Sequence, residues 1–281
     1  ADFHQLDVET PITITVTLST LVGYVLHSGA IDATSLWTAL GVFLLASSSS
    51  ALNQYQERNT DALMKRTRNR PLPSGRVGGV TAFMVVAFLF VAGVLVLYHK
   101  AGMISLGLGL LSFAWYNGLY TPLKYRTVFA LLIGAVIGAI PPLIGWTAAG
   151  GDITAIPVLF LAFFIYVWQV PHFILLLLLY GDDYRQAGLP ALTTMYPETA
   201  VRRIIFTWIT GIVVIGIMLP FICGMHYWST AALVMASSAA LGVYMLKLVV
   251  DRWSFRPKTA FVVMNLYLIG VLVVLAIDQL L

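Results

Sequence analysis

The sequence predicts an all-α, polytopic membrane protein, with about nine transmembrane helices bundled around a central cavity. Of its 281 residues, 59% are hydrophobic and only 10% are charged, and the mean hydropathy is +0.89. The apolar residues fall in long runs, most of them near the ~20 residues that a helix needs to cross a bilayer. A soluble domain could not bury this much apolar surface, so we expect the chain to lie in a lipid bilayer.

Nine apolar runs can be read along the chain, and glycine, proline or charged residues separate them. The N-terminal segment ADFHQLDVETP is acidic and lacks the Arg-rich pattern of an organellar targeting peptide. We therefore expect the first run to be retained, and the chain to lie in the inner (plasma) membrane of a bacterium or archaeon. The runs cover residues 11–27, 35–52, 79–97, 103–119, 128–147, 153–179, 204–225, 229–249 and 259–277.

The distribution of positive charge predicts the orientation. With a cytoplasmic N-terminus, the loops near 53–78, 120–127, 180–203 and 247–258 face inward, and they contain every Lys and Arg except Lys100. Positive residues gather in cytoplasmic loops, so the C-terminus is expected outside. This topology explains the net charge of +4 without nucleic-acid binding. The single cysteine excludes a disulfide framework within the chain.

The first candidate site lies in residues 53–76. Asn53, Glu57 and Asp61 are spaced four residues apart, which places them on one face of a helix. Oxygen ligands of this kind suit Mg²⁺ bound together with a substrate phosphate. The alternative is a solvated, positive-inside loop that happens to contain acids. Four cations follow: Lys65, Arg66, Arg68 and Arg70. Pro71, Pro73 and Gly75 are then expected to make a rigid turn.

The second candidate site is at the sixth run, where Asp182 and Asp183 follow the polar residues Gln169 and His172. On a continuous helix Gln169, His172 and Asp183 share one stripe. Polar side chains inside a membrane span are costly unless they line a cavity, and Pro171 is expected to kink the helix beside them. The alternatives are a core histidine bonded to a neighbouring helix and acids solvated at a helix end.

A third polar group lies at the inner end of the fourth run: Tyr116, Asn117, Tyr120, Lys124 and Arg126. Taken alone, interfacial aromatics followed by cations are typical of membrane anchoring.

Three further features concern packing. Pro141 and Pro142 are expected to interrupt a helix where its backbone lines a cavity. Residues 47–50, all serine, and the pair Gly134 and Gly138 favour close helix packing. The long inward loops lie four runs apart, which suggests two four-helix halves facing a shared cavity.

Two acidic clusters and several cations are thus expected on one face of a bundle open to lipid. Such a site suits a substrate with a diphosphate head and a hydrocarbon tail. Mg²⁺ and the cations would stabilise the departing diphosphate. An apolar cavity would shield an allylic carbocation from water until an acceptor attacks.

These residues resemble a known family. Asn53, Glu57 and Asp61, running into MKRTRNRPLPSG, resemble the first motif of the UbiA superfamily of intramembrane prenyltransferases. WQVPHF (168–173), DYRQAGLPAL (183–192) and IGAIPPLIGW (137–146) resemble its protoheme IX farnesyltransferase branch, the haem O synthases. The resemblance implies one prenyltransferase domain over residues 1–281. It also implies transfer of the farnesyl group of farnesyl diphosphate to a vinyl group of haem B, with addition of water, to give haem O.

The resemblance also implies the roles of the candidate residues. Mg²⁺ and the diphosphate would be held by Asn53, Glu57, Asp61, Asp182 and Asp183. The phosphate charge would be neutralised by Lys65, Arg66, Arg70, Lys124 and Arg126. Haem would be contacted by Trp168, Gln169 and His172. A haem-modifying enzyme or a terminal oxidase is an expected partner.

The chain departs from the family pattern at several positions. Glu57 stands where many members have Asp, and Ala187 stands where other branches have a second Asp after Asp183. Basic residues expected near Pro11 and Gly181 are absent from the sequence. Two alternatives stay open: a UbiA-type enzyme with another acceptor, such as a phenolic ring, and a transporter of anionic lipids or metabolites.

Overall fold

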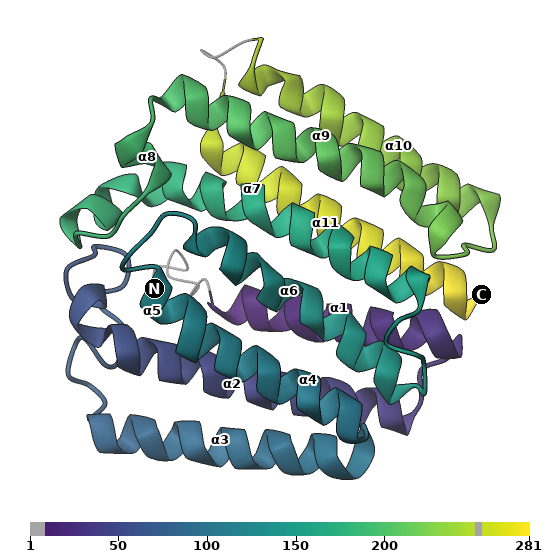
Figure 1. Ribbon diagram of the computed structural model, residues 1–281, viewed down its shortest axis with the longest axis horizontal. Coiled ribbons are helices and arrows are strands. Elements are labelled where there is room, and N and C mark those ends of the chain that lie inside the picture. Colours follow the sequence, from purple (N-terminus) through teal and green to yellow (C-terminus); the bar gives the residue numbers. More distant parts are fainter. Residues whose placement is uncertain (1–8, 251–254) are drawn as a thin grey trace, which may run out of the picture.

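The computed structural model describes residues 9–250 and 255–281, and that part of the chain is helical without any strand. The N-terminal residues 1–8, where no targeting peptide is expected, and Arg252, one of the predicted inward cations, lie outside these ranges. The helices are α1 (Glu9–Ser28), α2 (Ala33–Asp61), α3 (Gly79–Lys100), α4 (Met103–Ala114), the π-helix η1 (Trp115–Tyr120), α5 (Thr121–Leu123), α6 (Ala130–Ala148), α7 (Ile156–Gln186), α8 (Leu192–Met195), α9 (Glu198–Ile222), α10 (Trp228–Met245), the 3₁₀-helix η2 (Leu246–Leu248) and α11 (Pro257–Leu280) (Figure 1).

The all-helical membrane fold is confirmed. In the described ranges, seven helices are long and apolar enough to cross a bilayer. The first and fourth apolar runs form α1 and the consecutive elements α4, η1 and α5, which fall outside that set. Nine crossings therefore stay a prediction, although each predicted run has its helix.

The helices lie side by side as a slab, with α1 and α6 between two groups (Figure 1). One apolar core joins α2, α3, α4 and α6, around Leu45 and Leu97. The larger core joins α1 and α6 to α7, α9, α10 and α11, around Phe164 and Met264. The helix α3 covers one edge and exposes a row of large apolar side chains. Such a surface is stable only against lipid.

The helices α1 and α6 cross at very close range. A Cβ atom on Gly23 would overlap the Pro142 carbonyl, and one on Gly145 would overlap the Thr20 carbonyl. The expectation that Pro141 and Pro142 interrupt the helix beside a cavity is wrong, because α6 continues through both residues. Prolines remove hydrogen bonds from a helix, but here α1 packs against the affected backbone.

The predicted close packing of small residues is confirmed. Ser48 donates a 2.8 Å hydrogen bond to the Val86 carbonyl of α3. Gly134 lies under the ring of Tyr120, and Gly138 lies under the side-chain amide of Gln169. Small side chains let helix backbones approach closely in a membrane.

The connections divide between the two ends of the slab. The links that follow α2, α5 and α7 gather at one end, at the left in Figure 1, while those that follow α1, α3, α6 and α9 lie at the other. The predicted inward loops therefore share one end. This arrangement brings the candidate site residues together.

Candidate functional site

The C-terminal end of α2 carries a row of buried polar side chains. Asn53, Glu57 and Asp61 are 6%, 5% and 3% exposed. The helix extends through all three residues, so the four-residue spacing places them on one face, as the sequence predicts. Buried charges need partners. Lys124 forms an ion pair with Glu57, and Arg70 lies 2.8 Å from Asp61.

The π-helix η1 brings Lys124 to this row. Its Asn117 donates a 2.6 Å hydrogen bond to Ser49, and Thr121, at the start of α5, donates a 2.9 Å bond to the Asn53 side-chain oxygen. Both bonds tie the inner end of the fourth run to α2. Such π-helical turns occur frequently at functional sites. Asn117 and Lys124 of the third polar group thus contact α2, Lys124 through its ion pair with Glu57. Ser49 belongs to the serine run that the sequence marks for helix packing, and its hydrogen bond to Asn117 adds a role in the site. Thr121 was not singled out from the sequence, because an isolated hydroxyl residue carries no distinctive pattern.

Asp183 joins the second cluster to the first. Its two carboxylate oxygens accept hydrogen bonds from the backbone N–H groups of Lys65 and Arg66, both at 3.3 Å. The guanidinium of Arg66 lies 5.1 Å from the centre of the Tyr180 ring, a cation–π contact. Asp183 therefore holds the loop that follows α2 against the end of α7.

A local departure from helical geometry orients this end of α7. Tyr180 has φ −122° and ψ 21°, so the regular phase of the helix is lost there, and the predicted stripe from Gln169 to Asp183 is interrupted. The sequence predicts a kink at Pro171. Within the described helix the non-helical angles occur at Tyr180, nine residues later and directly before Gly181.

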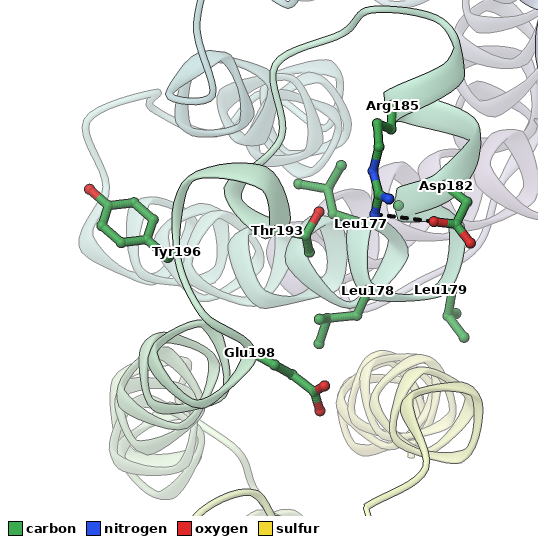
Figure 2. Close-up of a pocket in the computed structure, with 9 residues that line it drawn as sticks. Leu177, Leu178, Leu179, Asp182, Arg185, Thr193, Tyr196 and Glu198 are labelled. Carbon is green, nitrogen blue, oxygen red and sulfur yellow. Dashed lines mark ion pairs between the residues drawn. The ribbon is translucent and has the colours of Figure 1, made fainter.

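Asp182, which the sequence groups with the candidate metal ligands, lies apart from the other four. Its side chain is 84% exposed and lies 3.2 Å from Arg185. Figure 2 shows both residues at a surface pocket of about 250 Å³ beside α8, with Thr193 and Glu198. Adjacent helical residues point about 100° apart, so burial of Asp183 turns Asp182 outward.

Two of the predicted phosphate-binding cations are peripheral. The side chains of Lys65 and Arg126 are exposed. Arg66 is partly buried, and its Nε atom has no hydrogen-bond partner, which leaves a donor available for an anion.

The proposed acceptor residues lie deeper along α7. His172 is buried between the rings of Trp168 and Phe261, at centroid distances of 4.7 and 4.8 Å, and its Nδ1 atom has no hydrogen-bond partner. Trp168 donates a 3.0 Å hydrogen bond to the Met264 carbonyl of α11. Gln169 instead faces Gly138 of α6. The three residues thus contact two different neighbouring helices.

An aromatic stack connects the two regions. Tyr120 stacks on Tyr116 at 5.5 Å and on Phe173 at 6.3 Å between ring centroids. Tyr120 directly precedes Thr121, which contacts Asn53, and Phe173 directly follows His172. The stack therefore adjoins both the carboxylate row and the histidine.

The residues present fit Mg²⁺ only in part. Across the described ranges, no three His, Cys, Asp or Glu side chains come close enough to hold a metal ion alone. The donors are nevertheless all oxygen atoms, which Mg²⁺ prefers, and Mg²⁺ commonly uses one or two carboxylates together with water and substrate phosphates. Asn53, Glu57, Asp61 and Asp183 fit a magnesium–diphosphate complex better than a metal cage made by protein alone.

Comparison with known proteins identifies the family. The pattern of the UbiA prenyltransferase family matches residues 16–269. The chain belongs to the UbiA prenyltransferase family. Within it, a protoheme IX farnesyltransferase from Nitratidesulfovibrio vulgaris is 36% identical over 270 residues, covering 96% of this chain and 92% of the relative. One from Geobacter sulfurreducens is 42% identical over 204 residues, covering 72% and 75%.

Solved structures of UbiA proteins share the fold. A UbiA homologue from Aeropyrum pernix superposes with a TM-score of 0.78 at 19% identity, covering 95% of this chain and 98% of the other. One from Archaeoglobus fulgidus, bound to GPP and Mg²⁺, gives 0.71 at 12% identity, covering 95% and 96%. Its family, its relatives and its long apolar helices make this UbiA protein a multi-pass membrane prenyltransferase.

Proposed function

We propose that this protein transfers the farnesyl group of farnesyl diphosphate to a vinyl group of haem B, forming haem O. One observation carries the proposal: relatives 36% and 42% identical over most of the chain are protoheme IX farnesyltransferases. The buried carboxylates and cations at one end of the bundle support it. We further propose that this end faces the cytoplasm, that the membrane is a bacterial or archaeal inner membrane, and that haem-modifying enzymes or a terminal oxidase take up the product.

The diphosphate end of the substrate would lie at the inner end of α2. Asn53, Glu57, Asp61 and Asp183 would hold Mg²⁺, which supplies Lewis-acid stabilisation of the leaving diphosphate. Arg66 would donate its unpartnered Nε–H to phosphate oxygen, a charge-assisted hydrogen bond. Lys124 and Arg70 would add positive charge beside it.

The reaction breaks the bond between C1 of the farnesyl group and the diphosphate oxygen, which keeps the electron pair. A vinyl carbon of haem B then bonds to C1, and water supplies hydroxide to the resulting cation and releases a proton. The rings of Tyr116 and Phe173, which stack on Tyr120, would stabilise the allylic cation if it lies beside them. The aromatic stack would also help to exclude water from this cation. His172 and Trp168 would contact the haem beyond Phe173.

The test is incubation of the purified protein with farnesyl diphosphate, Mg²⁺ and haem B. We expect haem O by mass spectrometry, and loss of the product with a chelator that excess Mg²⁺ reverses. If diphosphate is released with a phenolic acid and not with haem B, the acceptor is the phenolic ring and the proposal of haem B is wrong. Absence of diphosphate release with either acceptor would refute prenyl transfer and favour a transporter.

A further inference from the structure

The candidate metal ligands are already engaged by groups of the protein itself. Glu57 is paired with Lys124, and Asp61 with Arg70. The Asn53 side-chain oxygen accepts from Thr121. In each ion pair both side chains are at least four-fifths buried. The cations therefore neutralise carboxylates that solvent reaches only slightly.

A metal ion that bound to these carboxylates alone would have to displace the cations. Lys124 would then be a buried charge separated from Glu57, and Arg70 would lose its ion pair with Asp61; breaking a buried ion pair is strongly unfavourable. Free carboxylates of an open metal site attract Mg²⁺ more strongly than carboxylates whose charge a cation already neutralises. The absence of a three-ligand acidic cluster in the described ranges agrees with this arrangement.

A diphosphate changes this balance, because it brings several negative charges of its own. Lys124 and Arg70 can then exchange carboxylate oxygens for phosphate oxygens, while the released Glu57 and Asp61 turn to the metal. Both cations remain paired, and the number of buried ion pairs does not fall. Arginine and lysine both bind phosphate well, arginine with two parallel hydrogen bonds.

From this geometry we propose that Lys124 and Arg70 are exchangeable counter-ions that make Mg²⁺ binding depend on the diphosphate. The inference rests on the proposed function, because it assumes a diphosphate substrate at this site. In the free protein the two cations keep the carboxylates occupied. The metal and the diphosphate enter as mutually dependent ligands, and the dependence is reciprocal.

The test uses the full-length purified protein, with Mn²⁺ as a spectroscopic substitute for Mg²⁺, since both ions prefer oxygen ligands. Binding of Mn²⁺ is measured by electron paramagnetic resonance without and with inorganic pyrophosphate, after correction for the complex of the two in solution. We expect pyrophosphate to tighten Mn²⁺ binding about 5–150-fold, the usual range of coupling between two ligands. Mn²⁺ should tighten pyrophosphate binding by the same factor.

Variants at Lys124 isolate its role. Lys124→Gln releases Glu57, so Mn²⁺ should bind more tightly to the protein without pyrophosphate, and the coupling should fall several-fold. Lys124→Arg should keep the coupling. Arg58→Gln is the matched control: it removes a positive charge one residue from Glu57, but the Arg58 guanidinium lies over the Tyr55 ring at 4.5 Å. Arg70→Gln tests the second pair, and replaces Lys124→Gln if that variant does not elute as folded protein.

Equal Mn²⁺ affinity with and without pyrophosphate overturns the counter-ion proposal, as does unchanged coupling in Lys124→Gln. Production of haem O by the same preparation would then leave the proposed function intact. Conversely, strong coupling in a protein that forms no haem O overturns the proposed acceptor and keeps the counter-ion exchange.

Discussion

The ion pair between Asp61 and Arg70 allows a quantitative test of the site. The two atoms Asp61 Oδ2 and Arg70 Nη1 are 2.8 Å apart, and both side chains are more than nine-tenths buried. At an effective dielectric constant of about 20, two unit charges at this distance attract by about 6 kcal/mol. Loss of hydration opposes much of this attraction. Removal of one partner from a buried pair costs about 3–5 kcal/mol, because the other charge stays buried.

A double-mutant cycle measures the pair directly. Asp61→Asn, Arg70→Gln and the double variant are unfolded in mixed micelles without metal, and the free energies of unfolding are compared. We expect each single change to lower the free energy of unfolding by about 3 kcal/mol. The double variant should lose much less than the sum, which gives an interaction energy of about 2–3 kcal/mol.

The exposed pair Asp182–Arg185 supplies the control within the same chain. Its atoms are 3.2 Å apart, but both side chains are largely exposed, so its cycle should give only about 0.2–1 kcal/mol. If the Asp61–Arg70 cycle yields the same small value as this surface pair, burial does not strengthen the interaction, and the reasoning about displaced counter-ions is refuted.

Three further outcomes are expected. Asp183→Ala frees the backbone N–H groups of Lys65 and Arg66, so amide exchange across residues 62–70 should accelerate and haem O formation should fall about 10–100-fold. The control Asp182→Ala, at the exposed neighbour, should change neither quantity. Unaltered amide exchange in Asp183→Ala would contradict the role of that carboxylate. Gly145→Ala places a methyl group against the Thr20 carbonyl and should destabilise the protein by about 1–3 kcal/mol, seen as a lower Tm, whereas Gly107→Ala points into open space and should not. Hydrogen bonds from the Ser35 backbone N–H and the Tyr24 hydroxyl hold the pKa of Asp32 below its ordinary value of 3.8. The stabilisation of α2 by Asp32 is therefore complete above about pH 4 and declines as the pH falls through the lowered pKa. The Tm of Asp32→Asn should lack this decline, and a Tm that still falls as steeply as that of the parent protein would contradict the role of Asp32.

The helices and half of the site were predictable from the sequence. Long apolar runs leave few choices in a membrane, because every backbone polar group needs a partner and a helix supplies it. The four-residue spacing of Asn53, Glu57 and Asp61 predicted one helix face, because residues four apart lie on the same side of a helix.

The remaining features depend on contacts between distant segments. The spacing of residues could not show that Lys124 pairs with Glu57, because the π-helix η1 sets the phase of α5. Nor could it separate Asp182 from Asp183, since the break at Tyr180 decides which carboxylate turns inward. The continuity of α6 through its two prolines could not be predicted either, because Gly23, which packs against Pro142, lies on another helix.

The lengths of α2 and α7 determine how the substrate reaches the site. At 1.5 Å per residue, their 29 and 31 residues measure about 43 and 46 Å, against a hydrocarbon core about 30 Å thick. The excess in α2 is about nine residues, which corresponds to the stretch from Asn53 to Asp61. With Ala33 at one edge of the hydrocarbon core, the carboxylates would lie at the depth of lipid headgroups, and the aromatic stack would lie among the acyl chains. A prenyl diphosphate dissolved in the bilayer already holds its head and tail at these two depths, so it can arrive by lateral diffusion without leaving the membrane.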